Sequence, residues 1–162
     1  MQLHGHGERA RTQRGPQGVG RPPGERSVGV RRYECQVCGA TVTVRPPGMV
    51  RRRLYGACAI GLALALFGLQ GQSAGAVREA IAPTASARDP AEGATWSTLR
   101  RWAHEAKAGT LLVEGHACPE TFTLRQAAAR AATTLQALGQ RGAAGLERVW
   151  QGALDARWGG AS

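Results

Sequence analysis

The chain has 162 residues, and although 43% of them are hydrophobic, only 5% are aromatic, which excludes a large aromatic core. Its four cysteines are too few and too unevenly spaced for the disulfide scaffold of a small secreted protein. The net charge of +10 is concentrated in residues 1–53, which hold eleven arginines and three glutamates and therefore favour a polyanionic partner.

Residues 1–30 are rich in glycine, arginine and proline and show no hydrophobic periodicity. We expect this segment to be a disordered basic arm, or alternatively the distal loop of the unit that follows it. Its arginines would either neutralise phosphates or form a solvated charged run, and the sequence leaves both interpretations open.

Residues 31–48 contain Cys35 and Cys38, followed by Gly39 and by a β-prone run at 41–44. A tight turn that presents two thiolates to one metal ion, with a strand on each side, is typical of half a zinc ribbon. The consecutive prolines that follow end the hairpin. The sequence therefore predicts zinc as the cofactor, with these two cysteines as ligands.

Other side chains could complete this metal site. His4 and His6 would give a set of two cysteines and two histidines, and His116 and Cys118 form a second candidate pair. The alternative is a vestigial cysteine turn that binds no metal. In that case little would hold the short hairpin, because structural zinc supplies folding energy directly.

Apolar residues at helical spacing predict helices over residues 58–69, 74–81, 96–108, 123–138 and 143–157. Ser73 is the expected N-cap of the second helix. In the third helix, Trp96, Leu99 and Trp102 are expected to form the buried stripe.

These helices predict two helical units after the hairpin. The first, over residues 51–109, contains three helices and a long loop at 83–95. The second, over residues 110–162, contains a connector and a helical hairpin that could join two copies of the chain as a homodimer. The predicted fold class is mostly α, with one small β-hairpin.

The run Arg-Tyr-x-Cys-x-x-Cys-Gly-x-Thr-x-x-Val-x-Pro-Pro from residue 32, together with Thr-Leu-Arg-Arg-Trp at 98–102, resembles bacterial insertion-sequence proteins. In that family a zinc ribbon precedes a helix-turn-helix of the transposase type. The resemblance covers about residues 31–108. It implies DNA binding in a transposition system, and it leaves open that the chain is truncated at its N-terminus.

The resemblance also implies which side chains contact DNA. In a helix-turn-helix one short helix lies in the major groove, and here that helix begins near Trp96. Contacts to the phosphate backbone are expected from Arg51, Arg52 and Arg53. Contacts from the recognition helix are expected from these residues: Ser97, Thr98, Arg100 and Arg101. Alternatively, Ser97 and Thr98 could cap that helix, and one of the two arginines could pair with Glu105.

Three alternatives compete with this interpretation. The same fold could serve a transcription regulator. The uncharged stretch at 54–77, preceded by three arginines, could anchor a small membrane protein, but its most apolar part is shorter than the ~20 residues needed to span a bilayer. An enzyme is not expected, because no strand-forming run after residue 44 could carry a set of metal-binding carboxylates. We therefore expect a cytoplasmic, non-catalytic DNA-binding protein.

Overall fold

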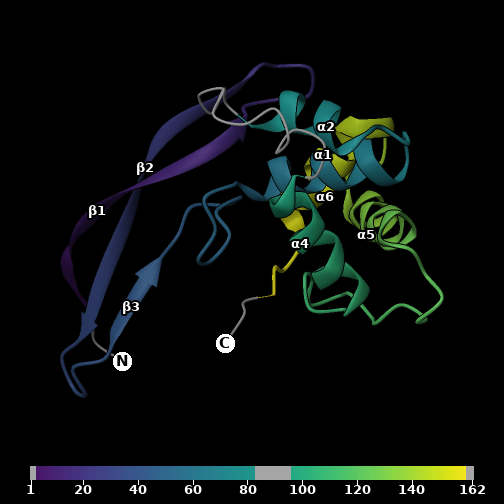
Figure 1. The fold of residues 1–162 in the computed structure, drawn as a ribbon. Coiled ribbons are helices and arrows are strands. Elements are labelled where there is room, and N and C mark those ends of the chain that lie inside the picture. Colours follow the sequence, from purple (N-terminus) through teal and green to yellow (C-terminus); the bar gives the residue numbers. More distant parts are fainter. Residues whose placement is uncertain (1–2, 83–95, 160–162) are drawn as a thin grey trace.

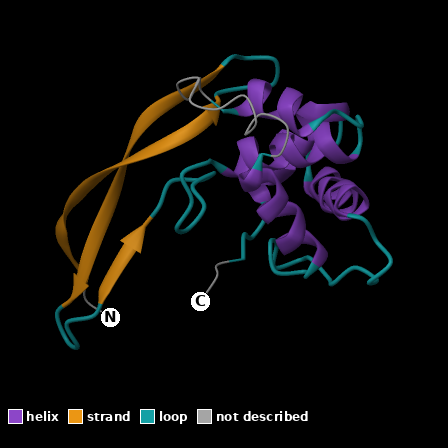
Figure 2. Cartoon of the chain, viewed as in Figure 1, coloured by secondary structure: helices purple, strands orange, loops and turns teal. Residues whose placement is uncertain are grey.

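The computed structural model describes residues 3–82 and 96–159, which form an antiparallel sheet and a body of helices. The strands are β1 (Leu3–Pro16), β2 (Pro23–Cys35) and β3 (Thr41–Val44). The helices are α1 (Ala57–Gly68), α2 (Ala74–Ile81), α4 (Ser97–Lys107), α5 (Leu124–Leu138) and α6 (Gly145–Asp155). The sheet forms a long twisted arm beside the helices (Figures 1 and 2). The fold is therefore α+β, and the expected mostly α class is wrong.

The arm is built by a segment that was expected to be disordered. Strand β1 pairs with β2 from Leu3 opposite Cys35 to Pro16 opposite Pro23, with one irregularity between Gly5 and Glu8. Strand β2 also pairs with β3, so the two strands predicted around the cysteine pair are confirmed. Residues 3–12 are all exposed, so neither face of β1 is buried there and no alternation of apolar and polar residues is needed. This is why the sequence pattern did not reveal the long strand.

Helix α1 is the centre of the helical body and is buried on all sides. Every residue from Ala57 to Leu66 is buried, and α1 contacts α2, α4, α5 and α6. A helix that is apolar all round lies in a protein core or in a membrane, and these contacts supply the protein core. In the ranges 3–82 and 96–159, no helix is long and apolar enough to cross a membrane.

The predicted helices are present to within a residue or two. Ser73 caps α2 by accepting a hydrogen bond from the amide of Ala76 at 3.2 Å. The predicted stripe of α4 is buried, with Leu99 and Trp102 each 1% exposed. Helices α5 and α6 contact each other, and both pack on α1. The expected loop at 83–95 lies outside the described residues.

Several contacts attach the arm to the helices and to the loop before α1, among them the backbone hydrogen bond from the amide of Arg14 to the carbonyl of Leu54 at 2.7 Å. At one end, the turn at 17–22 places Val19 against the helical core. Further along, Gln13, a buried polar residue of β1, donates from Nε2 to the carbonyl of Gly48 at 2.9 Å and accepts from Nε of Arg26 at 2.8 Å. The loop that contains Gly48, residues 45–56, connects β3 to α1. The end of the arm that carries the cysteines projects away from the helices (Figure 1).

Candidate nucleic-acid interface

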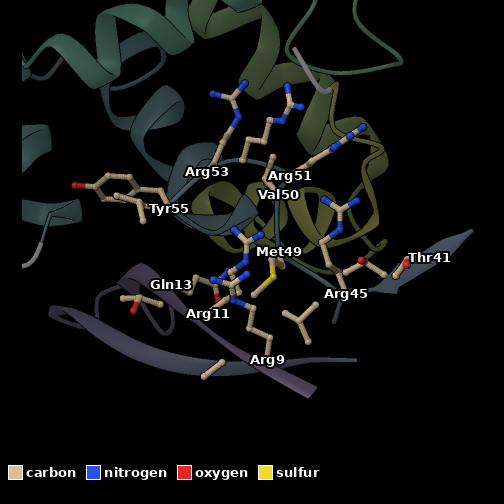
Figure 3. Close-up of a pocket in the computed structure, with 16 residues that line it drawn as sticks. Arg9, Arg11, Gln13, Thr41, Arg45, Met49, Val50, Arg51, Arg53 and Tyr55 are labelled. Carbon is tan, nitrogen blue, oxygen red and sulfur yellow. The ribbon is translucent and has the colours of Figure 1, made fainter. Parts of the chain in front are cut away.

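A basic cleft of about 730 Å³ lies between β1 and the loop 45–56. None of the described residues that line it is acidic. Six of them are arginines, which are Arg9, Arg11, Arg45, Arg51, Arg52 and Arg53. Figure 3 shows Arg9 and Arg11 of β1 on one side of the cleft and Arg51 and Arg53 of the loop on the other. We refer to these six residues as the arginine cleft.

Strand geometry explains how β1 contributes to this surface. Side chains two residues apart lie on the same face of a strand, so Arg9 and Arg11 share a face with Gln13. The hydrogen bond from Gln13 to Gly48 turns that face towards the loop. Val30, the partner of Arg9 across the strands, is 4% exposed and lines the same cleft.

The loop reaches its position through one buried side chain and two unusual backbone conformations. Val50 is 3% exposed, which anchors the loop and leaves the next residue, Arg51, exposed. Gly48 has a φ of +79°, which favours glycine, and Arg52 has a φ of +57°, which is uncommon for other residues. The loop is therefore tightly turned on both sides of Val50.

Four of the six arginines in the cleft have no partner among the residues that the structure describes. Within residues 3–82 and 96–159, the guanidinium groups of Arg9, Arg11, Arg45 and Arg51 make no hydrogen bond or ion pair. Arg53 differs, because it forms an ion pair with Glu105 of α4. Several uncompensated arginines on one concave surface produce a positive potential that attracts polyanions.

The two arginines predicted on the recognition helix point in different directions. Arg100 and Arg101 are both exposed on α4. Arg101 lies four residues before Glu105, so the two share the helix face that pairs with Arg53 of the cleft. Arg100 lies instead on the face of Lys107, whose Nζ donates to the carbonyl of Glu120 at 2.8 Å.

The other residues predicted at the start of α4 make no capping contact. The N-cap position is occupied by Trp96, and no side chain caps that end of the helix. Ser97 is exposed and Thr98 is half-buried. The loop arginines Arg51, Arg52 and Arg53 line the cleft, as a role in phosphate contact requires.

The cysteine pair lies at the projecting end of the arm. The amide of Cys35 donates to the carbonyl of Ala40 at 2.9 Å, and the amide of Gly39 donates to the carbonyl of Cys35 at 2.9 Å. Hydrogen bonds from the amides of Cys38 and Val37, together with one from the Cys38 side chain, lower the pKa of the Cys35 thiol, although burial opposes them. The turn therefore makes the Cys35 thiol ionise more readily than an ordinary cysteine.

The residues present do not complete a zinc site. Leu3 is opposite Cys35 in the register and His4 is opposite Glu34, so His4 and Cys35 lie on different faces of the sheet. His6 instead contacts Glu34, with Nδ1 3.2 Å from Oε2. A structural zinc site needs four ligands.

The second candidate pair does not complete the site either. Among the residues that the structure describes, no group of three or more His, Cys, Asp or Glu side chains could hold a metal ion. The exposed His116 and the half-buried Cys118 belong to no such group. Zinc binding through Cys35 and Cys38 thus stays a prediction.

Three cleft residues were missed at the sequence level, namely Arg9, Arg11 and Arg45. A weak signal was present in the partner strand alone, where Val28 and Val30 lie two residues apart. An apolar residue at every second position is the signature of a strand. Gly29 between these two valines disfavours a strand and concealed that signal.

Comparisons with known proteins identify no relative. No protein-family profile, no curated protein and no solved structure matches the chain. The resemblance to insertion-sequence proteins therefore stays a prediction, and the arguments for function rest on the geometry of the cleft.

Proposed function

We propose that this chain binds duplex DNA through the arginine cleft. The observation that carries the proposal is the convergence of six arginines from two segments on one surface, four of them without a partner among the described residues. Each phosphate that an arginine neutralises releases condensed counterions, which supplies affinity that does not depend on base sequence. The exposed Arg101 on the cleft side of α4 would extend this contact.

The proposed role is that of a non-catalytic partner in the transposition of a mobile element. The link to transposition rests on the sequence resemblance. The non-catalytic role likewise rests on the sequence. In the structure, Glu105 and Glu114 are each paired with an arginine. Beyond Val44, the described residues contain no strand that could display a set of metal-binding carboxylates.

The test is the salt dependence of duplex binding. Fluorescence anisotropy with a labelled duplex would be recorded over a series of salt concentrations, for the wild-type protein and for Arg9→Ala/Arg11→Ala. Loss of two phosphate contacts should reduce the steepness of log K against log salt by about 1.8. The control Arg130→Ala/Arg141→Ala removes the same charge from exposed positions outside the cleft and should leave the slope unchanged.

An equal reduction of the salt slope in the two double variants would contradict the proposal, because duplex binding would then depend only on net charge. The choice of target separates the remaining alternatives. Preference for the ends of a mobile element would support the transposition role. A palindromic site bound by a dimer would instead support a transcription regulator, with exposed residues of α5 and α6 such as Leu138 and Leu154 available for dimer contacts.

A further inference from the structure

One ion pair connects the arginine cleft to helix α4. Nη1 of Arg53 lies 3.4 Å from Oε1 of Glu105, and Nη2 of Arg53 contacts Oε2 of the same carboxylate, so both oxygens are engaged. The two residues are 52 positions apart in the sequence. The pair is partly desolvated, since the side chain of Arg53 is 11% exposed and that of Glu105 is 24% exposed. A two-pronged contact of this kind fixes the direction of the arginine as well as its charge.

The same loop and helix are joined a second time by aromatic rings. Tyr55 packs edge-to-face against Trp96 and Trp102, with ring centroids 5.8 and 5.2 Å apart. Leu54, between the two attached residues, is 54% exposed. On the other side of the loop, Gly48 is tied to β1 through Gln13. The segment that carries the unpartnered Arg51 is therefore held at both ends.

From these contacts we propose that Glu105 is a positioning residue for DNA binding, and this inference rests on the proposed function. Glu105 neutralises Arg53 and ties the loop to α4, so that Arg51 is held across the cleft from Arg9. Arg53 itself stays with Glu105 and contacts no phosphate. In the free protein the arginines of the cleft repel one another, and the Arg53–Glu105 pair removes one of these charges from the repulsion.

This role and simple electrostatics predict opposite results for Glu105→Gln. If Glu105 acted only through its negative charge near the cleft, its removal would raise DNA affinity. If Glu105 positions the loop, its removal should weaken binding by roughly tenfold, because residues within one ion-pair network are energetically coupled. The slope of log K against log salt should stay unchanged, because the number of phosphate contacts is the same.

The experiment uses the full chain and a fixed duplex, at a temperature at which circular dichroism shows every variant to be folded. The variants are Glu105→Gln, Arg53→Ala and the combination of both, and the combination should bind no more weakly than either single variant. The matched control is Glu114→Gln, which breaks the pair between Glu114 Oε1 and Arg157 Nε at 2.7 Å, where the glutamate side chain is also 24% exposed. This control should leave DNA affinity unchanged.

Two further variants separate a positioning role from a direct contact. Arg51→Ala should reduce the steepness of the salt dependence by about 0.9, as expected for one lost phosphate contact. Arg53→Ala should leave that slope unchanged while it weakens binding. Arg53→Lys keeps the charge but loses the two-pronged contact, so it should also weaken binding, and it serves as the test if the alanine variant does not fold.

Three results would overturn the inference. Tighter binding by Glu105→Gln would show that the carboxylate only repels DNA. A reduced salt slope for Arg53→Ala would show that Arg53 contacts a phosphate. If Glu105→Gln and Arg53→Ala both bound duplex with wild-type affinity, the Arg53–Glu105 ion pair would have no role in DNA binding. If the wild-type protein itself showed no salt-dependent binding to duplex, the proposed function would fail and this inference with it, a result distinct from the other three.

Discussion

Gly152 of α6 packs directly on the carbonyl group of Leu135 in α5, so closely that a Cβ atom added to Gly152 would lie 2.6 Å from the carbonyl carbon. The side chain of Leu135 extends from this crossing to α1, where a Cβ added to Gly61 would lie 3.1 Å from its Cδ1. Two glycines thus allow α1, α5 and α6 to approach one another closely. The helical body formed in this way contacts the arginine cleft through the Arg53–Glu105 pair.

Gly152→Ala should lower the free energy of unfolding by about 2–3 kcal/mol, because the added methyl group meets backbone atoms that cannot move aside. Urea denaturation followed by circular dichroism would measure the loss. Gly24→Ala is the control, because nothing lies within 4 Å of its added Cβ, and it should cost less than about 0.5 kcal/mol. Wild-type stability of Gly152→Ala would mean that α5 and α6 are further apart than the structure shows.

Leu64→Ala should destabilise the protein far more than Leu54→Ala. Leu64 is fully buried in α1, and truncation of a buried leucine costs about 2–5 kcal/mol. Leu54 is 54% exposed, so its truncation should cost less than about 0.5 kcal/mol. Both variants would be compared by urea denaturation. Equal and small effects would contradict the burial of α1 in a protein core, and would reopen the interpretation of residues 54–77 as a membrane anchor.

The cysteines should differ in their reaction with iodoacetamide, since the thiolate is the reactive form. Burial raises the pKa of Cys58 to about 12, so at pH 8 Cys58 is almost entirely a thiol and should stay unmodified until the protein unfolds. The pKa of Cys35 is lowered by the amides of its turn, so its modification should continue at lower pH than for an ordinary thiol.

Mass spectrometry of the alkylated peptides would measure both rates, with the urea-unfolded chain as the reference in which the two cysteines should react alike. The same experiment with added zinc tests the predicted metal site. Protection of both Cys35 and Cys38 by zinc would support it. Modification of Cys58 in the folded protein as fast as that of Cys35 would contradict the structure.

Arg101→Ala should weaken duplex binding more than Arg100→Ala does. Arg101 lies on the same helix face as Glu105, which contacts the cleft, whereas Arg100 lies on the face of Lys107. Loss of one phosphate contact at Arg101 should reduce the steepness of the salt dependence by about 0.9. The two variants remove the same charge from neighbouring exposed positions, so each controls for the other. A larger effect of Arg100→Ala would mean that α4 presents its other face to DNA.

Local patterns in the sequence were sufficient to predict the helices. Ser73 was expected to cap α2 and does so, because the capping bond spans only three residues. The stripe of Leu99 and Trp102 was expected to be buried, because helical spacing alone puts the two residues on one side. The turn between Cys35 and Cys38, with a strand on each side, was likewise predicted from adjacent residues.

The first long strand could not be predicted in this way. Strand β1 is defined by its pairing with β2, and most of its outer residues are exposed on both faces, so no hydrophobic alternation marks it. The burial of α1 on all sides could not be predicted from the sequence either. Its apolar residues fit a protein core or a membrane equally well, and only its contacts with four other helices decided between them.

The sequence by itself determined the helices, the Ser73 cap of α2 and the turn that carries the cysteines, because each depends on residues within a few positions of one another. Only the tertiary structure determined which arginines come together in the cleft. Arg9 and Arg51 face each other across it only because the arm folds back along the loop. Arg53 meets Glu105 across 52 residues, and so distant a contact leaves no periodic signal in the sequence. Helices and turns leave a local pattern in the sequence, whereas a contact between distant side chains depends on the whole fold.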